Sequence, residues 1–318
     1  MDPNDVSVRC ESILDEIRSA VIVDRSVLRT MLVGALADGH VLLEDVPGTG
    51  KTLTAGSIAD ALGLSFSRIQ FTPDLLPSDV TGSNVFDERS GEFAFQPGPV
   101  FANVVLADEI NRAPPKTQAA LLEAMEEGQV TVDGTTRELP EPFVVLATQN
   151  PVEMDGTFEL PAAQKDRFMI KTSLGYPDFD GEMELLDRRA SRTDKSPSVD
   201  RVCTPEVVDE LRASPERVSV EVPVRRYLLT VARETRLDER VESGVSPRGV
   251  QRFFEAVRTL AAVRGRSYAR PDDVKTLAPR ALSHRLILTT DARVDRVDGT
   301  TVIEDILERV QVPQLAAS

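Results

Sequence analysis

The chain of 318 residues has no tryptophan, only two cysteines and only two histidines. Cys10 and Cys203 cannot form a disulfide framework, and with His40 and His284 they do not make a zinc cluster. No apolar run reaches the length of about 18 residues that a membrane-spanning helix needs. The acidic N-terminus also lacks the basic start and apolar stretch of a secretory signal. We therefore expect a reduced, cytoplasmic protein without a membrane span.

Basic residues are scarce as well. The 37 lysines and arginines are outnumbered by 52 acidic residues, which gives a net charge of −15. Non-specific binding to nucleic acid depends on neutralising phosphates, so a chain this acidic is poorly suited to it. The charge balance therefore makes nucleic acid an improbable partner.

The order of apolar runs predicts the fold class. Strand-like runs occur at 41–43, 65–71, 104–107, 143–148 and 168–174, and helical patterns such as 53–62 and 116–127 lie between several of them. This alternation is typical of an α/β fold with a parallel sheet. The pattern in two further segments, 82–97 and 129–139, predicts β-hairpins with turns at 87–92 and 133–134. From about 177 to 283 the pattern is mostly helical, so we predict an α/β domain at 1–178 and a helical domain at 179–318.

The segment after the first strand-like run carries the clearest chemical signal. A glycine-rich turn at the start of a helix directs backbone N–H groups at an anion. Here Lys51 can reach the phosphates of a nucleotide, and Thr52 can hold Mg²⁺. Asp45 stands where the usual pattern has its first glycine, and its side chain must point away from the phosphates. The alternative is a chance glycine-rich turn. The segment reads Asp45, Val46, Pro47, Gly48, Thr49, Gly50, Lys51, Thr52 and Leu53.

Two carboxylates follow the strand-like run at 104–107. Asp108 is placed to hold Mg²⁺ and Glu109 to polarise an attacking water, as phosphoryl transfer requires. The alternative is a solvated strand end. Asn150 follows the run at 143–148, where it can orient the water or contact the γ-phosphate, or simply cap a turn before Pro151.

Two arginines complete the set of candidates. The position of Arg167 suggests an arginine finger, although a structural salt bridge to Asp166 is the alternative. Arg248 begins a helix in the second domain after Pro247, which is favourable in the first turn. It could reach back to the nucleotide, or it could be one more surface arginine of an arginine-rich helix.

These motifs, in this order, resemble the MoxR group of the AAA+ ATPases over about residues 10–290. The similarity also includes the segments 39–48, 68–79, 97–103, 108–113, 147–151 and 160–164. It implies an AAA+ P-loop NTPase core, in which helices flank a parallel five-stranded sheet, with a C-terminal α-helical lid. Asp24 stands where the family often has glycine, in a segment beside the adenine.

The resemblance also implies roles for the candidate residues. Gly48 to Thr52 would be Walker A, Asp108 and Glu109 Walker B, Asn150 sensor 1 and Arg248 sensor 2. Arg167 would act on the ATP of a neighbouring subunit, which implies a homo-oligomeric ring, usually a hexamer. The hairpins at 82–97 and 129–139 would be the helix-2 insert and the hairpin before sensor 1.

ATP and Mg²⁺ are the cofactors that this family implies. Its members resemble chaperones that assemble or activate client proteins, often with a partner that bears a von Willebrand factor A domain. Three other functions stay open: a nucleic-acid motor, a metal-chelatase ATPase subunit, and a nucleotide-gated binding module that hardly turns over. The segment 225–270 favours the motor, because its eleven arginines and five acids give it a net charge of +6. Since the whole chain has a net charge of −15, the rest of the chain has a net charge of −21. We prefer a basic lid that docks on the acidic core of a neighbouring subunit.

Overall fold

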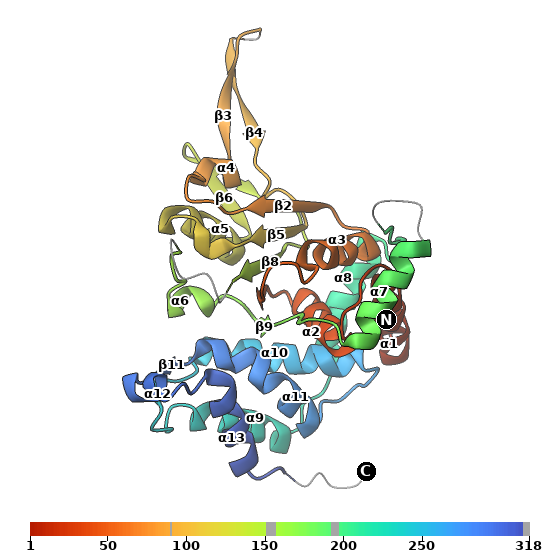
Figure 1. The fold of residues 1–318 in the computed structure, drawn as a ribbon, viewed down its shortest axis with the longest axis vertical. Helices are drawn as coiled ribbons and strands as arrows, with labels where there is room; N and C mark the ends of the chain where they lie inside the picture. Colours follow the sequence, from red (N-terminus) through yellow and green to blue (C-terminus); the bar gives the residue numbers. More distant parts are fainter. Residues whose placement is uncertain (90, 151–156, 192–196, 314–318) are drawn as a thin grey trace.

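The computed structural model describes residues 1–89, 91–150, 157–191 and 197–313. They form a parallel sheet flanked by helices and, below it in Figure 1, a body of helices from the C-terminal part of the chain. This arrangement confirms the predicted α/β fold with a C-terminal helical lid. Among the described helices, none is long and apolar enough to cross a membrane.

The five strands of the main sheet are all parallel and follow the order β2-β5-β8-β1-β9. Each overlaps a run that the sequence predicts as a strand. Because all strands point the same way, the loops that follow them meet at one edge of the sheet, here called the carboxyl edge. The segments that precede the strands meet at the opposite edge, here called the amino edge. The bounds are β1 (Val41–Glu44), β2 (Phe66–Gln70), β5 (Val104–Asp108), β8 (Val144–Gln149) and β9 (Ile170–Thr172).

Side chains along the inner strands β1, β5 and β8 alternate between two apolar clusters, as the pleat of a strand requires. In β1, Val41 and Leu43 belong to the cluster with α1 (Pro3–Ala20), α2 (Arg25–Leu36) and α3 (Lys51–Leu62). Leu42 belongs to the second cluster, with α5 (Pro115–Glu127). Both faces of the sheet are therefore covered, which explains why its inner strands are apolar almost throughout.

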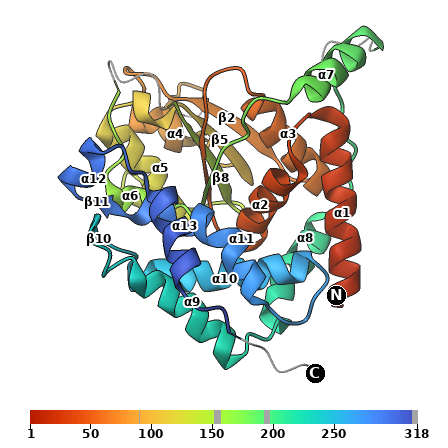
Figure 2. The same ribbon diagram turned by 60° about the horizontal axis from the view of Figure 1, so that its bottom comes forward.

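The helical part packs on the first cluster, as the tilted view in Figure 2 shows. Phe253 and Leu260 of α10 are buried in the same cluster as Ile13 of α1 and Leu32 of α2. Since one apolar core joins the two parts, the domain boundary at 178 stays a prediction. The helices after β9 are α7 (Phe179–Ser191), α8 (Pro205–Ala213), α9 (Val222–Glu234), α10 (Pro247–Val263), α11 (Pro271–Leu282), α12 (Thr290–Val294) and α13 (Gly299–Arg309). Of these, α7 buries no residue and takes no part in the first cluster.

Two features of the helical part were not predicted. Helices α12 and α13 lie beyond 283, within the predicted helical domain but past the region where the sequence shows a helical pattern. The short strands β10 (Val241–Ser243) and β11 (Ile287–Leu288) pair antiparallel and join the segment before α10 to the segment before α12. Strands β10 and β11 have only three and two residues, and elements this short carry little periodic signal.

Both predicted hairpins are present. The first, of β3 (Gly82–Asp87) and β4 (Glu92–Pro97), projects from the body of the molecule (Figure 1). The second, of β6 (Gln129–Val132) and β7 (Thr135–Glu138), turns at Asp133 and Gly134, which both have positive φ as a tight hairpin turn demands. Three short helices link these elements: α4 (Pro77–Thr81), the 3-10 turn Ile110–Arg112 and α6 (Ala162–Lys165).

Candidate nucleotide site

The loop between β1 and α3 has the backbone shape of a phosphate-binding turn. Gly48 and Gly50 have φ angles of 87° and 85°, in the left-handed region that glycine adopts without steric cost. A Cβ atom at either position would meet no heavy atom within 4 Å, so the space around these residues is open. Gly50 caps α3 without a side-chain hydrogen bond, which leaves the first N–H groups of this helix available to an anion.

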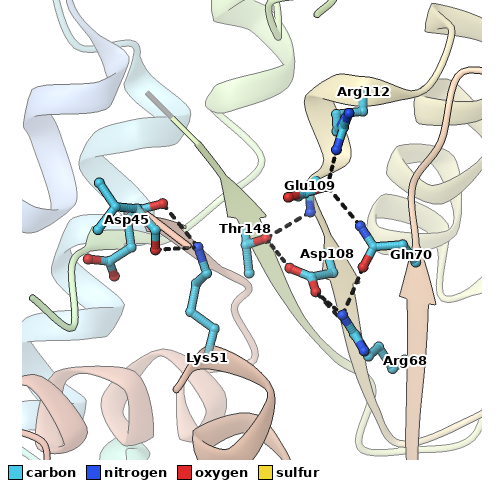
Figure 3. Close-up of polar contacts among 9 residues, drawn as sticks. Asp45, Lys51, Arg68, Gln70, Asp108, Glu109, Arg112 and Thr148 are labelled. Atoms are coloured by element: carbon cyan, nitrogen blue, oxygen red, sulfur yellow. Dashed lines mark hydrogen bonds and ion pairs between the residues drawn. The ribbon is translucent and has the colours of Figure 1, made fainter. Parts of the chain in front are cut away.

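Lys51 begins α3 and turns its ammonium group into this loop (Figure 3). Its Nζ donates hydrogen bonds to the carbonyl oxygens of Asp45 (3.0 Å) and Val46 (3.2 Å). An ammonium group held by backbone carbonyls can exchange them for phosphate oxygens without leaving a carboxylate unpaired. Thr52, the next residue, is exposed, so its hydroxyl is accessible to a metal ion.

Asp45, which replaces the first glycine of the usual motif, turns its carboxylate away from the loop. It accepts hydrogen bonds from the Ser173 hydroxyl (2.7 Å) and from the backbone N–H groups of Leu174 (2.6 Å) and Gly175 (3.1 Å). These residues follow β9 directly. The prediction that this side chain points away is confirmed, and the carboxylate ties the phosphate loop to the end of the neighbouring strand.

The two predicted acids lie at the end of β5. Glu109 has a φ angle of 56°, which is uncommon for a residue other than glycine. The Thr148 hydroxyl of β8 donates to Asp108 Oδ1 (2.7 Å) and accepts from the Glu109 N–H (2.8 Å). One hydroxyl from the next strand therefore fixes the backbone turn that presents both carboxylates (Figure 3).

Two side chains of β2 contact these acids, although motif reasoning assigned them no role. Arg68 donates to Asp108 Oδ2 through Nε (3.1 Å) and Nη2 (2.6 Å), and Gln70 Nε2 donates to Glu109 Oε2 (2.9 Å). Arg112 contacts the same glutamate oxygen (3.0 Å). The signal that could have found Arg68 and Gln70 is their alternation on one face of β2, because the parallel register sets Gln70 beside Asp108.

The carboxyl edge gathers most of the predicted residues. Strands β1 and β5 both pair with β8, so the phosphate loop, the acid pair and Asn150 follow three adjacent strands. Asn150 is buried directly after β8. Pro151, which completes its motif, lies outside the described residues.

A cavity of about 800 Å³ lies beside the start of α3. Its lining includes Leu53 of α3, Ile22 of the linker before α2, and Leu185 of α7. This size and partly apolar wall suit a purine base with its ribose. Asp24 follows the same linker, and its carboxylate caps α2 by accepting a hydrogen bond from the Ser26 N–H (2.7 Å).

The two candidate arginines meet at the amino edge instead. Arg167 lies three residues before β9, and its Nη2 is 2.9 Å from Glu126 Oε2. Arg248 Nη1 is 2.5 Å from the other oxygen of the same carboxylate, Oε1. Glu126 lies in the last turn of α5, and the preceding carbonyl, of Met125, is 3.0 Å from Nε2 of His40, directly before β1. Both arginines are thus at the opposite edge from the phosphate loop.

The expectation that Arg248 reaches back to the nucleotide of its own chain is therefore not met in this structure. Arg252, one turn further along α10, approaches the Asp38 carbonyl (3.5 Å), which also precedes β1. The physical reason is that α10 packs on α1 and α2 with its first turn below the amino edge. A role for Arg248 in binding nucleotide stays a prediction.

Among the described residues, Arg167 does not form the salt bridge to Asp166 that was the alternative to an arginine finger. Asp166 Oδ1 accepts from Arg285 of the helical part, and Arg285 Nη2 also donates to the Phe168 carbonyl (2.8 Å). The Asp166 carboxylate is therefore used to hold the helical part, while Arg167 extends to Glu126.

The residues of the carboxyl edge fit Mg²⁺ bound together with a triphosphate. Among the described residues, no three His, Cys, Asp or Glu side chains form a cage that could hold a metal ion alone. Mg²⁺ usually takes one or two protein ligands and completes its shell with phosphate oxygens and water. The Thr52 hydroxyl and the Asp108 carboxylate match that requirement.

Comparison with known proteins agrees with this geometry. Residues 40–170 match the model of the ATPase family associated with various cellular activities (AAA), and residues 233–306 match the AAA lid domain. The uncharacterized protein YeaC of Bacillus subtilis is 43% identical over 300 residues, which cover 94% of this chain and 93% of that protein. Chaperone MoxR1 of Mycobacterium tuberculosis is 40% identical over 316 residues, which cover 96% of this chain and 83% of that protein. The chain belongs to the MoxR family of AAA+ ATPases.

A solved structure extends the MoxR-family likeness to the whole fold. The crystal structure of a candidate ATPase from Cytophaga hutchinsonii superposes with a TM-score of 0.91 at 36% sequence identity, and the match covers 98% of this chain and 97% of that one. The AAA match spans the sheet from β1 to β9, and the lid match falls on the helical part.

Proposed function

We propose that this MoxR-family protein hydrolyses ATP to ADP and phosphate at the subunit interfaces of a cytoplasmic homo-oligomeric ring, a hexamer. The division of the site supports this most strongly. One chain has the triphosphate-binding residues at the carboxyl edge and Arg167 with Arg248 at the amino edge. A head-to-tail contact between identical chains would bring the two half-sites together, and such contacts form a ring when the rotation between neighbours closes.

The carboxyl edge would bind and orient the reactants. Lys51 and the first N–H groups of α3 would bind the phosphates, and Asn150 would orient the attacking water. Glu109 would polarise that water, while Gln70 holds one of its carboxylate oxygens in place. Thr52 and Asp108 would hold Mg²⁺, which when bound neutralises charge on the phosphates.

The amino edge of the next chain would complete the site. An arginine finger is worth about 10³–10⁵ in rate, because it offsets charge on the transferred phosphoryl group. We therefore propose that an isolated chain binds ATP but hydrolyses it slowly. Ring formation then controls turnover.

Remodelling of a client protein is the proposed use of this hydrolysis. The β3–β4 hairpin projects from the core and exposes Val85, Phe86 and Phe93 (Figure 1). The two phenylalanine rings stack edge to face with centroids 5.3 Å apart. Exposed apolar groups on a projecting element suit contact with another protein. A partner with a von Willebrand factor A domain is part of the same proposal.

The arginine-rich segment 225–270 supports a protein client over nucleic acid. Six of its eleven arginines form ion pairs with acids among the described residues, so at least their charge is already compensated within the chain. The six are Arg240, Arg248, Arg252, Arg258, Arg264 and Arg266.

The proposed hydrolysis is tested with Glu109→Gln. This change keeps the shape of the side chain but removes the carboxylate that polarises water, so ATP should bind and persist unhydrolysed. Filter binding of labelled ATP and release of phosphate measure the two effects, with Glu308→Gln on the exposed side of α13 as the control. Turnover at the wild-type rate in Glu109→Gln, or no phosphate release by the wild-type chain, would contradict the proposal.

A further inference from the structure

Glu126 contacts both arginines of the amino edge, although no sequence motif points to it. We propose that Glu126 is a positioning residue that holds Arg167 and Arg248 side by side, so that both reach the triphosphate bound by the next chain. This inference rests on the proposed function.

The geometry leaves both arginines able to bind a further group. A guanidinium has five N–H donors, and Glu126 takes a single terminal nitrogen from each arginine. The side chains of Arg167 and Arg248 are 28% and 45% exposed, so their remaining donors are accessible to a neighbouring molecule. The carboxylate therefore fixes the direction of each arginine without consuming its capacity to bind phosphate.

Electrostatics gives the reason for a carboxylate at this position. Two guanidinium groups side by side repel each other, and one carboxylate between them offsets that repulsion. Glu126 is also in the last turn of α5, where the helix dipole favours nearby cations. The hydrogen bond from Arg248 and the charge of Arg167 hold the pKa of Glu126 below its usual range, although burial opposes them. The group thus stays ionised at neutral pH.

The pair also joins the core to the lid. Arg167 belongs to the core, whereas Arg248 lies in the first turn of α10, where Ser246 caps the helix through the Gly249 N–H (3.0 Å). A shift of the lid that moves Arg248 therefore acts on the carboxylate that holds Arg167. In this way Glu126 makes the direction of the finger depend on how the lid is docked.

The test compares Glu126→Gln with Glu127→Gln in the full-length chain. Glu127 is the next residue, is exposed, and forms no ion pair with a described residue. We expect Glu126→Gln to lower kcat about tenfold, within the range of couplings between contacting residues, with ATP affinity within about twofold of wild type. Assembly driven by a non-hydrolysable ATP analogue, followed by sedimentation velocity, should need about tenfold more protein. Glu127→Gln should match wild type in all three measurements.

A chain that lacks both arginines shows whether Glu126 acts through them. In a chain with Arg167→Ala and Arg248→Ala, adding Glu126→Gln should leave nucleotide-driven assembly unchanged. Three results would overturn this inference but not the proposed function. The first is that Glu126→Gln and Glu127→Gln behave alike, and the second is that Glu126→Gln raises kcat. The third is that Glu126→Gln weakens assembly as much in the double-alanine chain as in wild type. A wild-type chain that neither releases phosphate nor assembles with nucleotide would overturn the proposed function and this inference with it.

Discussion

The two edges of the main sheet are built differently. At the carboxyl edge, Lys51 is held by backbone carbonyls and Arg68 by Asp108, and a bound ligand can replace these contacts. At the amino edge, buried imidazoles bind the backbone: His40 Nδ1 accepts from the Val145 N–H (3.0 Å), and His284 Nε2 is 2.9 Å from the Phe168 carbonyl.

This difference suits a site that two chains share. The half that receives the nucleotide must exchange its partners during each cycle of binding and release. The half that supplies the arginines must keep them in one direction, because misplaced charge stabilises the transition state poorly. The rigid edge therefore belongs to the donor of the arginines and the exchangeable edge to the receiver of the nucleotide.

The largest effect is expected from Arg167→Ala, which removes a residue of the amino edge. Turnover should fall by about 10³-fold or more, whereas ATP affinity should stay near that of wild type, because the phosphate loop is at the other edge. Steady-state phosphate release and calorimetric titration with ATP measure the two quantities. Arg293→Ala on α12, an exposed arginine, serves as the control. A parallel loss of ATP affinity would show that the two edges do not divide the work in this way.

A smaller effect is expected from Arg68→Gln at the carboxyl edge. Arg68 pairs with Asp108, so it competes with Mg²⁺ for that carboxylate. A partly exposed ion pair is worth about 1 kcal/mol, which corresponds to about fivefold in binding. The Mg²⁺ concentration that supports half-maximal ADP binding should therefore fall about fivefold, whereas Arg293→Gln should leave it unchanged. A higher Mg²⁺ requirement in Arg68→Gln would mean that Arg68 helps to build the metal site.

An effect on stability, with no loss of a catalytic group, is expected from mild acid acting on the amino edge. Burial lowers the pKa of His40 to about 4, and burial together with Arg285 lowers the pKa of His284 well below its usual value. Between about pH 6.5 and 4 the unfolded chain therefore binds protons that the folded chain does not, and stability falls as the pH falls. Each histidine should cost about 1 kcal/mol of unfolding free energy at pH 5.5 relative to pH 7.5.

Urea unfolding at these two pH values measures that loss. Because the chain has only two histidines, NMR of their imidazole protons assigns it directly. Two resonances that titrate near pH 6.5 in the folded protein would contradict the buried, neutral imidazoles of the amino edge.

The sequence predicted the parts of the site that depend on neighbouring residues in the chain. The five strands, both hairpins and the glycine-rich turn follow from local patterns of apolar, turn-forming and small residues, and the structure confirms them. The orientation of Asp45 was also predictable, because a carboxylate that faced phosphates would repel them.

The parts that were missed depend on tertiary packing. Arg68 reaches Asp108 only because β2 pairs with β5, and Glu126 meets two arginines from segments 41 and 122 positions away. The edge to which Arg248 belongs is set by how α10 packs beneath the sheet. No local pattern in the sequence contains that information.

Mixing two inactive variants tests the shared site most directly. Lys51→Ala chains lose the phosphate contact but keep both arginines, and Arg167→Ala chains lose the finger but keep the phosphate loop. In a ring assembled at random from equal amounts, about one interface in four combines two intact halves. ATP hydrolysis should therefore return in the mixture to about a quarter of the wild-type rate. A mixture as inactive as its two components would show that each chain builds its site alone.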